Sequence, residues 1–201
     1  AVSAILCFWK LLRMTDIFDF KFRHLKMKKK YTLEIIRLGL PSGITQAIFS
    51  MAMVIVQSLT NSFGEMVIAA NVIIMRVDGF AMMPNFSFGT AMTTYAGQNV
   101  GAQRMDRVEQ GARQGTAIAL GTSAAITLLI LIFGKNLMAI FTNTSELVNL
   151  SANMMKILAV GYLAMAITQS LSGVMRGAGD TMTPMWISMI TTVVIRVPLA
   201  Y

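Results

Sequence analysis

The stretch VMRGAGDTMTP, residues 174–184, separates two long apolar runs. One of its two glycines can adopt the left-handed conformation that ends a helix, and Asp180 or Thr183 can cap the helix that follows. Pro184 suits the first turn of that second helix. A phosphate-binding loop is excluded, because such a loop needs a second glycine followed by Lys and Ser or Thr. The stretch therefore predicts a tight turn between two helices.

The apolar runs on either side are typical of a membrane protein. Of the 201 residues, 55% are hydrophobic and 13% are charged, whereas soluble domains have about 25% charged residues. A helix crosses the roughly 30 Å hydrocarbon core with about 20 apolar residues. The windows without Asp, Glu, Lys or Arg are Leu38–Gly64, Gly79–Gln103, Gln114–Gly134 and Ile157–Met175, with a shorter one at Thr181–Ile195. A soluble all-helical protein would need polar faces at helical spacing, which these windows lack.

We therefore expect an all-α, polytopic integral membrane protein. The polar breaks predict a helical tail at residues 1–9 and spans near 38–61, 67–96, 114–134, 149–173 and 183–201. Because the chain begins and ends inside apolar runs, we expect it to be a fragment of a longer polytopic protein.

Positive charge is concentrated on one side of these spans. The connection from Lys10 to Arg37 holds more than half of the 17 Lys and Arg residues. Alternating the sides puts the other arginine-rich connections on the same side, so the positive-inside rule predicts that residues 10–37, 97–113 and 174–183 are cytoplasmic. The net charge of +8 then reflects topology and contact with anionic lipid headgroups, and no nucleic-acid partner is expected.

The basic connection allows two interpretations, because its aromatic residues alternate with cations. It is either an amphipathic segment in the membrane interface or an ordinary solvated loop. Neither a disulfide nor a metal site is expected, since Cys7 and His24 are the only residues of their types. No catalytic pairing of carboxylates or of Ser, His and Asp is present, so we expect no enzyme activity and no cofactor.

Two charged residues fall deep inside the second predicted span. If that span starts near Met66, Arg76 and Asp78 lie about 15–18 Å from its start, near the membrane midplane. At a spacing of two they point to different helix faces and should not pair with each other. Ionisable groups in a membrane are functional-site candidates. Alternatively, the helix begins outside the hydrocarbon and both residues are structural hydrogen bonders near its outer end.

Other features of the spans also have two interpretations. Lys156 either snorkels to the interface or contacts substrate. Proline lies inside three spans, at Pro41, Pro84 and Pro198, as a kink or as a moving hinge. Glycines four residues apart predict close helix packing within one bundle, and the pairs are Gly39/Gly43, Gly97/Gly101 and Gly111/Gly115. The 18 Met and 11 Phe suit a pocket for apolar cations, although most must face lipid or other helices.

Three motifs together carry a family resemblance. IIRLGLPSGITQ (35–46), MRVDGFAMMPNFSFGTAMTTYAGQNVGAQRMDRV (75–108) and VMRGAGDTMTP (174–184) resemble the multidrug and toxic compound extrusion, or MATE, family in order and spacing. The resemblance implies a twelve-helix fold with two six-helix lobes. Residues 1–37 would be the end of helix six and the inter-lobe link, and residues 38–201 would be helices seven to eleven of the C-terminal lobe. The signature residues are Gly97, Gln98, Gly101, Arg176, Gly177, Gly179 and Asp180.

The resemblance also implies a function. The family exports organic cations and other amphiphiles in exchange for H⁺ or Na⁺, without a cofactor, by rocking its two lobes. The partners would be a small cationic or amphiphilic substrate, the bilayer and the N-terminal lobe of the same protein. Some relatives carry acidic residues in helices seven and ten, where this chain has Phe49 and Ala166, so we expect the coupling acid in the N-terminal lobe.

The cavity half contributed by this lobe would be lined by polar residues of its spans. The candidates are Gln46, Gln57, Asn61, Arg76, Asp78, Asn85, Lys156 and Gln169. One alternative is a lipid-linked sugar flippase of the same superfamily, which would need several cations in its cavity, whereas only Arg76, Lys156 and Arg196 lie within spans. A membrane scaffold that transports nothing is the other alternative.

Overall fold

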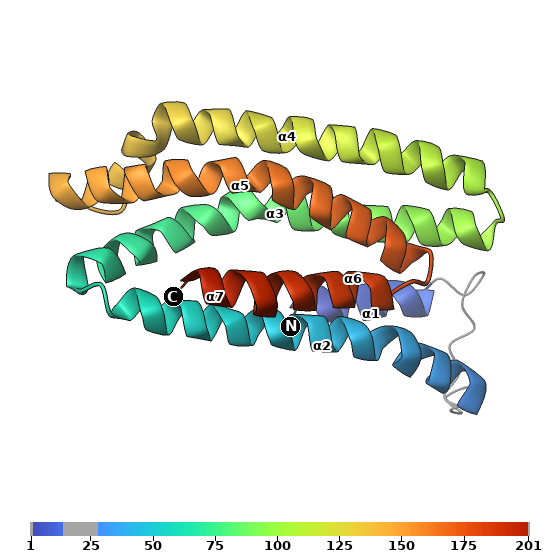
Figure 1. Cartoon of the computed structure of the whole chain (residues 1–201). Coiled ribbons are helices and arrows are strands. Elements are labelled where there is room, and N and C mark those ends of the chain that lie inside the picture. Colours follow the sequence, from blue (N-terminus) through green and yellow to red (C-terminus); the bar gives the residue numbers. More distant parts are fainter. Residues whose placement is uncertain (1, 14–27, 201) are drawn as a thin grey trace. The chain divides into compact units, whose positions relative to one another are not determined.

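The computed structural model describes residues 2–13 and 28–200, and this part of the chain is helical with no strand (Figure 1). The helices are α1 (Val2–Arg13), α2 (Lys29–Asn61), α3 (Glu65–Gly101), α4 (Met105–Ala139), α5 (Ser145–Gly177), α6 (Met182–Met189), the π-helix η2 (Ile190–Arg196) and α7 (Val197–Ala200). The chain divides into two units, residues 1–37 and residues 38–201, with the boundary inside α2.

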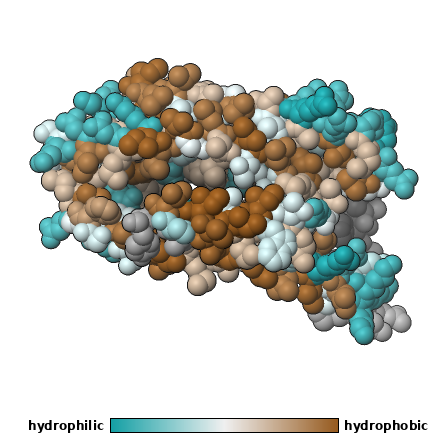
Figure 2. Space-filling model, viewed as in Figure 1, coloured by the Kyte–Doolittle hydropathy of each residue, from teal (hydrophilic) through white to brown (hydrophobic). Residues whose placement is uncertain are grey.

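Helices α2 to α5 are long and apolar enough to cross a membrane. They contain 33 to 37 residues, and at a rise of 1.5 Å per residue each is roughly 50 Å long, longer than the hydrocarbon core is thick. Figure 2 shows hydrophobic residues over the middle of the visible face and hydrophilic residues gathered towards its ends. The prediction of an all-α integral membrane fold is confirmed.

The predicted connections were too long, and this is a correction. Residues 97–113 were expected to be a loop, but α3 continues to Gly101 and α4 begins at Met105. The helix extends past the apolar run because its charged residues pair on its own surface, as in the 2.7 Å ion pair between Arg113 and Glu109 one turn apart.

The basic connection 10–37 is shortened in the same way. Helix α1 continues to Arg13, and α2 begins at Lys29, nine residues before the predicted start at residue 38. The two interpretations of this connection concern residues 14–27, which lie outside the described part of the chain.

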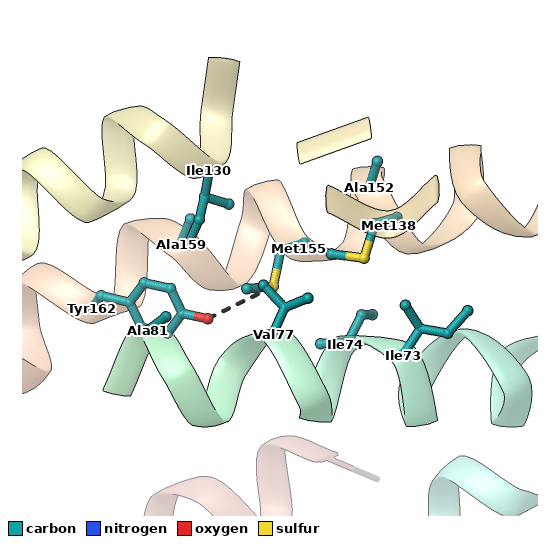
Figure 3. Packing of buried hydrophobic residues seen from close by; sticks show 10 residues of the cluster. All are labelled: Ile73, Ile74, Val77, Ala81, Ile130, Met138, Ala152, Met155, Ala159 and Tyr162. Carbon is teal, nitrogen blue, oxygen red and sulfur yellow. Dashed lines mark hydrogen bonds between the residues drawn. The ribbon is translucent and has the colours of Figure 1, made fainter. Parts of the chain in front are cut away.

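The core of the 38–201 unit is a bundle of α3, α4 and α5. Figure 3 shows its apolar cluster, in which side chains from the three helices meet around Met155 and Tyr162 of α5. The other members are Ile73, Ile74, Val77, Ala81, Ile130, Met138, Ala152 and Ala159. These residues come from the halves of the helices nearest the connections Ser62–Gly64 and Ile140–Thr144, which we call the amide end of the bundle because Asn61 and Asn143 flank it.

The opposite end carries the connections Ala102–Arg104 and Ala178–Thr181, and we call it the arginine end. Here α3 and α5 approach through glycine. A Cβ placed on Gly173 would collide with the carbonyl oxygen of Gly89, and one placed on Gly177 would collide with the carbonyl oxygen of Thr93. No other residue type fits at such backbone contacts without moving a helix.

The turn between α5 and α6 has the predicted chemistry. Gly179 has φ +91°, the left-handed region that favours glycine, and ends α5. The Asp180 carboxylate accepts a 3.0 Å hydrogen bond from the backbone N–H of Thr183 in the first turn of α6. This interaction lowers the pKa of the exposed Asp180 carboxyl below its usual value. The predicted tight turn is therefore confirmed.

The three prolines predicted to lie inside spans are within helices that continue through them: Pro41 in α2, Pro84 in α3 and Pro198 in α7. Pro84 has no N–H to donate to the carbonyl of Phe80, and Figure 1 shows α3 bent between its ends. The kink interpretation fits α3, and a moving hinge stays a prediction. The C-terminal span, predicted over 183–201, is helical over Met182–Ala200 but changes to a π-helix at Ile190–Arg196.

Candidate functional site

The two charged residues of α3 lie on different faces, as their spacing predicted. Asp78 is half-buried and accepts a 2.7 Å hydrogen bond from the hydroxyl group of Tyr162 in α5. The Tyr162 hydroxyl also lies 3.7 Å from the Met155 sulfur (Figure 3). Arg76 is exposed, and within the described residues it forms no ion pair with Asp78. The partner that Asp78 required is therefore a neutral phenol rather than a cation.

Asn85 joins the same group. It lies seven residues after Asp78, which is two helical turns, so both residues face α5. Its side chain is 3% exposed, and its amide nitrogen donates to the backbone carbonyl of Tyr162 at 3.5 Å. We call Asp78, Asn85 and Tyr162 the Tyr162 cluster. Tyr162 was not among the residues predicted from the sequence. A buried tyrosine hydroxyl needs a hydrogen-bond partner, so a tyrosine inside a span is a signal that could have identified Tyr162.

The opposite face of α3 is hollowed. An open depression of about 600 Å³ lies over residues that share one side of the helix, namely Gly79, Met83, Phe86, Ser87, Thr90 and Ala91. We call it the α3 groove. Helical spacing places Arg76 on the same face, two turns before Met83. The groove thus combines a thioether, an aromatic ring and hydroxyl groups, with one cation at its amide end.

A chain of side-chain amides connects α2 and α3 at the amide end. Gln57 donates to Asn61 at 3.0 Å and accepts from Asn71 at 3.3 Å. Asn71 was not among the predicted residues. The structure therefore brings together two of the eight predicted cavity residues, Gln57 and Asn61, in a network that links the adjoining ends of α2 and α3.

Three predicted residues lie apart from these groups. Gln46 and Lys156 are exposed, on α2 and α5. Gln169 is half-buried, and its backbone carbonyl would lie 3.1 Å from a Cβ on Gly89, so Gln169 belongs to the close contact between α3 and α5.

The signature residues cluster near the arginine end. A Cβ on Gly97 would lie 3.4 Å from the carbonyl oxygen of Gly177, so this glycine does serve helix packing. Within the described residues Gly101 has no neighbouring atom within 4 Å of a Cβ position, so its packing role stays a prediction. Gly39 and Gly43 are equally free of neighbours, whereas Gly111 and Gly115 pack against α3. Gln98 is exposed and Arg176 is half-buried.

Positions 49 and 166 offer no carboxylate. Phe49 of α2 is 37% exposed, and Ala166 of α5 is fully buried in the bundle. Within the described residues, no group of three His, Cys, Asp or Glu side chains could hold a metal ion.

Arg196 is a charged residue that the sequence placed in a span without assigning it to the cavity. Its guanidinium carbon lies 5.7 Å from the centre of the Phe49 ring, and one of its terminal nitrogens lies 3.6 Å from the Met53 sulfur. These contacts connect η2 to α2.

Comparison with known proteins identifies the family to which this arrangement belongs. The MatE family model matches residues 41–201, the greater part of the chain. The chain belongs to the MatE family. The match includes all of the three-helix bundle, the α3 groove and the Tyr162 cluster.

Curated relatives agree with this assignment. The chain is 28% identical over 179 residues to the probable multidrug resistance protein YoeA of Bacillus subtilis (strain 168), covering 89% of the chain and 39% of the relative. It is 29% identical over 168 residues to the probable multidrug resistance protein NorM of Thermotoga maritima, covering 84% of the chain and 36% of the relative. The chain thus spans less than two fifths of the length of either relative.

Solved structures of MatE proteins share the fold. An outward-facing multidrug resistance MATE family transporter of the MOP superfamily aligns with a TM-score of 0.87 at 22% identity, over 99% of this chain and 45% of that one. A MATE protein in the straight conformation also gives 0.87, at 21% identity and with the same coverage. The chain therefore has the fold of one part of a MATE transporter.

Proposed function

We propose that the chain is part of a secondary active transporter that exports organic cations and other amphiphiles in exchange for H⁺ or Na⁺. The observation that carries this proposal is the MatE match over residues 41–201. The names of the relatives, which are multidrug resistance proteins, support the substrate class. A transport function also accounts for a hollowed helix face inside a membrane fold, and it requires no enzyme activity.

The α3 groove supports an amphiphilic substrate. Its volume of about 600 Å³ is large enough for a small organic molecule, and the groove is open on the side away from α3. Phe86 offers an aromatic face to a cation, and Met83 offers a flexible, polarisable surface that adapts to different shapes. Ser87 and Thr90 add hydroxyl groups for orientation. The six lining residues are uncharged and Arg76 is the one cation on this face of α3, whereas the anionic lipid-linked sugar of a flippase would need several cations.

Coupling to an ion requires that ion and drug prefer different states of the transporter. Phe49 and Ala166 supply no carboxylate for a cation, and the Asp78 carboxylate already accepts a hydrogen bond from Tyr162. We therefore propose that the coupling acid lies in the part of the protein outside this chain, in the N-terminal lobe.

The test is export of a fluorescent cation by the full-length protein in efflux-deficient bacterial cells. Wild-type protein should increase ethidium loss from preloaded cells, and Phe86→Ala should slow export about two- to thirtyfold because a cation–π contact contributes roughly 0.5–2 kcal/mol. Phe133→Ala is the matched control, since Phe133 lies on α4, outside the α3 groove. Wild-type protein that exports no amphiphilic cation, at normal expression in the membrane, would overturn the proposal.

A further inference from the structure

Arg196 is a permanent charge in an apolar setting. It is the last residue of η2, whose sequence ITTVVIR has no other charged residue, and it contacts the apolar segment of α2 around Phe49 and Met53. A charged side chain inside a membrane span is costly and is retained at functional positions. Its contacts therefore need an explanation.

These contacts leave most of its hydrogen-bonding capacity unused. A guanidinium carries five N–H donors, and a thioether sulfur is a weak acceptor. Within the described residues, the ion pairs are Arg104 with Asp106 and Arg113 with Glu109, so no carboxylate neutralises Arg196. The only hydrogen bond recorded for it in that part of the chain goes to the Met53 sulfur.

The contact with Phe49 orients the group. The guanidinium carbon lies 5.7 Å from the ring centre, within reach of a cation–π contact. One terminal nitrogen donates to the Met53 sulfur, and within the described residues the other N–H donors have no hydrogen bond. Arg196 is half-buried, so part of its surface is accessible. Phe49 and Met53 thus hold the guanidinium on one side while other donors remain available.

The backbone at this position is also unusual. Residues 190–196 form a π-helix, a rare conformation that is found mostly at functional sites. The widened turn changes the direction of the side chains that follow it, relative to a regular α-helix. Arg196 ends this turn and contacts α2, so a functional role for the π-helix is to aim Arg196 at α2.

We propose that Arg196, with Phe49 and Met53, forms a binding site for a carboxylate on a transported amphiphile. The planar fork of the guanidinium matches a carboxylate in a bidentate pair, and the ring and thioether contact the apolar body of the ligand. This inference rests on the proposed export function and deepens it, because it assigns one residue of this chain to the recognition of a carboxylate on the substrate.

The test compares two dyes that differ in one group. Rhodamine 110 has a free carboxylate, and rhodamine 123 is its methyl ester. Fluorescence polarisation with purified full-length protein measures the affinity for each dye. Wild-type protein should bind both, and Arg196→Gln should weaken rhodamine 110 about tenfold or more, since a hydrogen bond to a charged group contributes roughly 1.5–3 kcal/mol. Binding of rhodamine 123 should change less than about twofold.

Two further variants separate charge from structure. Arg196→Lys keeps the charge but cannot form a bidentate pair, so it should restore rhodamine 110 binding only in part. Lys135→Gln removes an exposed charge near the end of α4 and should leave the affinity for both dyes unchanged. Thermal unfolding of each variant shows whether the fold is intact.

The outcomes decide between the inference and the general function. If Arg196→Gln lowers the affinity for both dyes equally, the residue only holds η2 against α2. If the affinity for rhodamine 110 is unchanged, Arg196 does not contact the carboxylate. Either result overturns the site. Failure of wild-type protein to bind rhodamine 110 while it binds and exports rhodamine 123 would overturn the site and leave the export function standing. Failure to export either dye would count against the export function, while the binding comparison would still judge the site.

Discussion

The two ends of the α3–α4–α5 bundle are held together by different kinds of contact. At the arginine end, backbone meets backbone, because Gly173 and Gly177 of α5 lie against carbonyl groups of α3. At the amide end, larger side chains such as Ile74 and Met155 fill the space between the helices, and Tyr162 reaches across to Asp78. Backbone contacts cannot adapt to a larger side chain, whereas side-chain contacts can repack.

The largest expected effect is at the backbone contact. Gly173→Ala should destabilise the full-length protein by roughly 2–3 kcal/mol, because its Cβ would collide with the Gly89 carbonyl group and force α3 and α5 apart. Gly161→Ala is the matched control on the same helix, where a Cβ meets no atom within 4 Å. It should stabilise the protein by roughly 0.5–1 kcal/mol through helix propensity alone. Opposite shifts of the thermal midpoint in detergent would confirm the comparison, and equal shifts would refute it.

The next effect concerns the Tyr162 cluster. Asp78→Ala and Tyr162→Phe should each lower the rate of ethidium export, and the double variant should lose less than the sum because both changes remove the same 2.7 Å hydrogen bond. The shared contribution should be roughly 1.5–3 kcal/mol, the range for a hydrogen bond to a charged group. If the losses of export rate in the two single variants add up to the loss in the double variant, the two residues act independently.

Arg76→Gln tests the opposite face of the same helix. Because Arg76 lies on the face of the α3 groove, we expect slower ethidium export with little change in thermal stability. The expected loss is a few-fold, about 1 kcal/mol, typical of an exposed charge. Unchanged export at equal protein level would assign Arg76 a structural role only.

A smaller effect is expected where glycine faces a side chain. A Cβ on Gly111 would collide with the ring of Tyr95, and one on Gly115 with the sulfur of Met92. Both neighbours are side chains that can move, although Tyr95 would give up its 3.1 Å hydrogen bond to the Arg107 carbonyl group, and alanine improves helix propensity by roughly 0.5–1 kcal/mol. Gly111→Ala and Gly115→Ala should therefore change stability by less than about 1 kcal/mol in thermal unfolding. A loss as large as that of Gly173→Ala would remove the distinction between the two kinds of contact.

The smallest effect is expected at the exposed turn after α5, and it depends on pH. The pKa of Asp180 is lowered because its carboxylate accepts a hydrogen bond from the Thr183 N–H. A lowered pKa means that the stabilising effect is complete above the unfolded value of about 3.9 and is lost as the pH falls through the folded value. Asp180→Ala should thus lower the thermal midpoint slightly at pH 7, and the difference from wild type should shrink at acidic pH. A constant difference would exclude the carboxylate as its cause.

The features predicted from the sequence are those that depend on local composition. The four long helices follow from charge-free windows, and the turn with Gly179 and Asp180 follows from residue types that suit few other conformations. The helix boundaries were less accurate, since α4 begins at Met105 rather than near residue 114. Hydropathy predicts which residues lie in the hydrocarbon core. A helix whose surface charges pair with each other continues beyond these residues, so its ends are not marked by hydropathy.

The contacts between helices could not be predicted in the same way. Gly173 and Gly177 have the same four-residue spacing as Gly39 and Gly43, yet only the first pair meets another backbone. The spacing shows that small residues share one face of a helix. It does not show which other helix packs against that face. For the same reason, the need of Asp78 for a partner was predictable, but the identity of Tyr162, 84 residues away, was not.

The glycine contact between α3 and α5 has a consequence for the order in which the protein assembles during synthesis. Gly89 and Gly173 are separated by the whole of α4, so their contact cannot form until α5 has left the ribosome. Before that point α3 can already pack against α4, because Tyr95 and Met92 of α3 lie against Gly111 and Gly115 of α4. We expect these two helices to enter the membrane as a hairpin, and α5 to complete the bundle when it arrives.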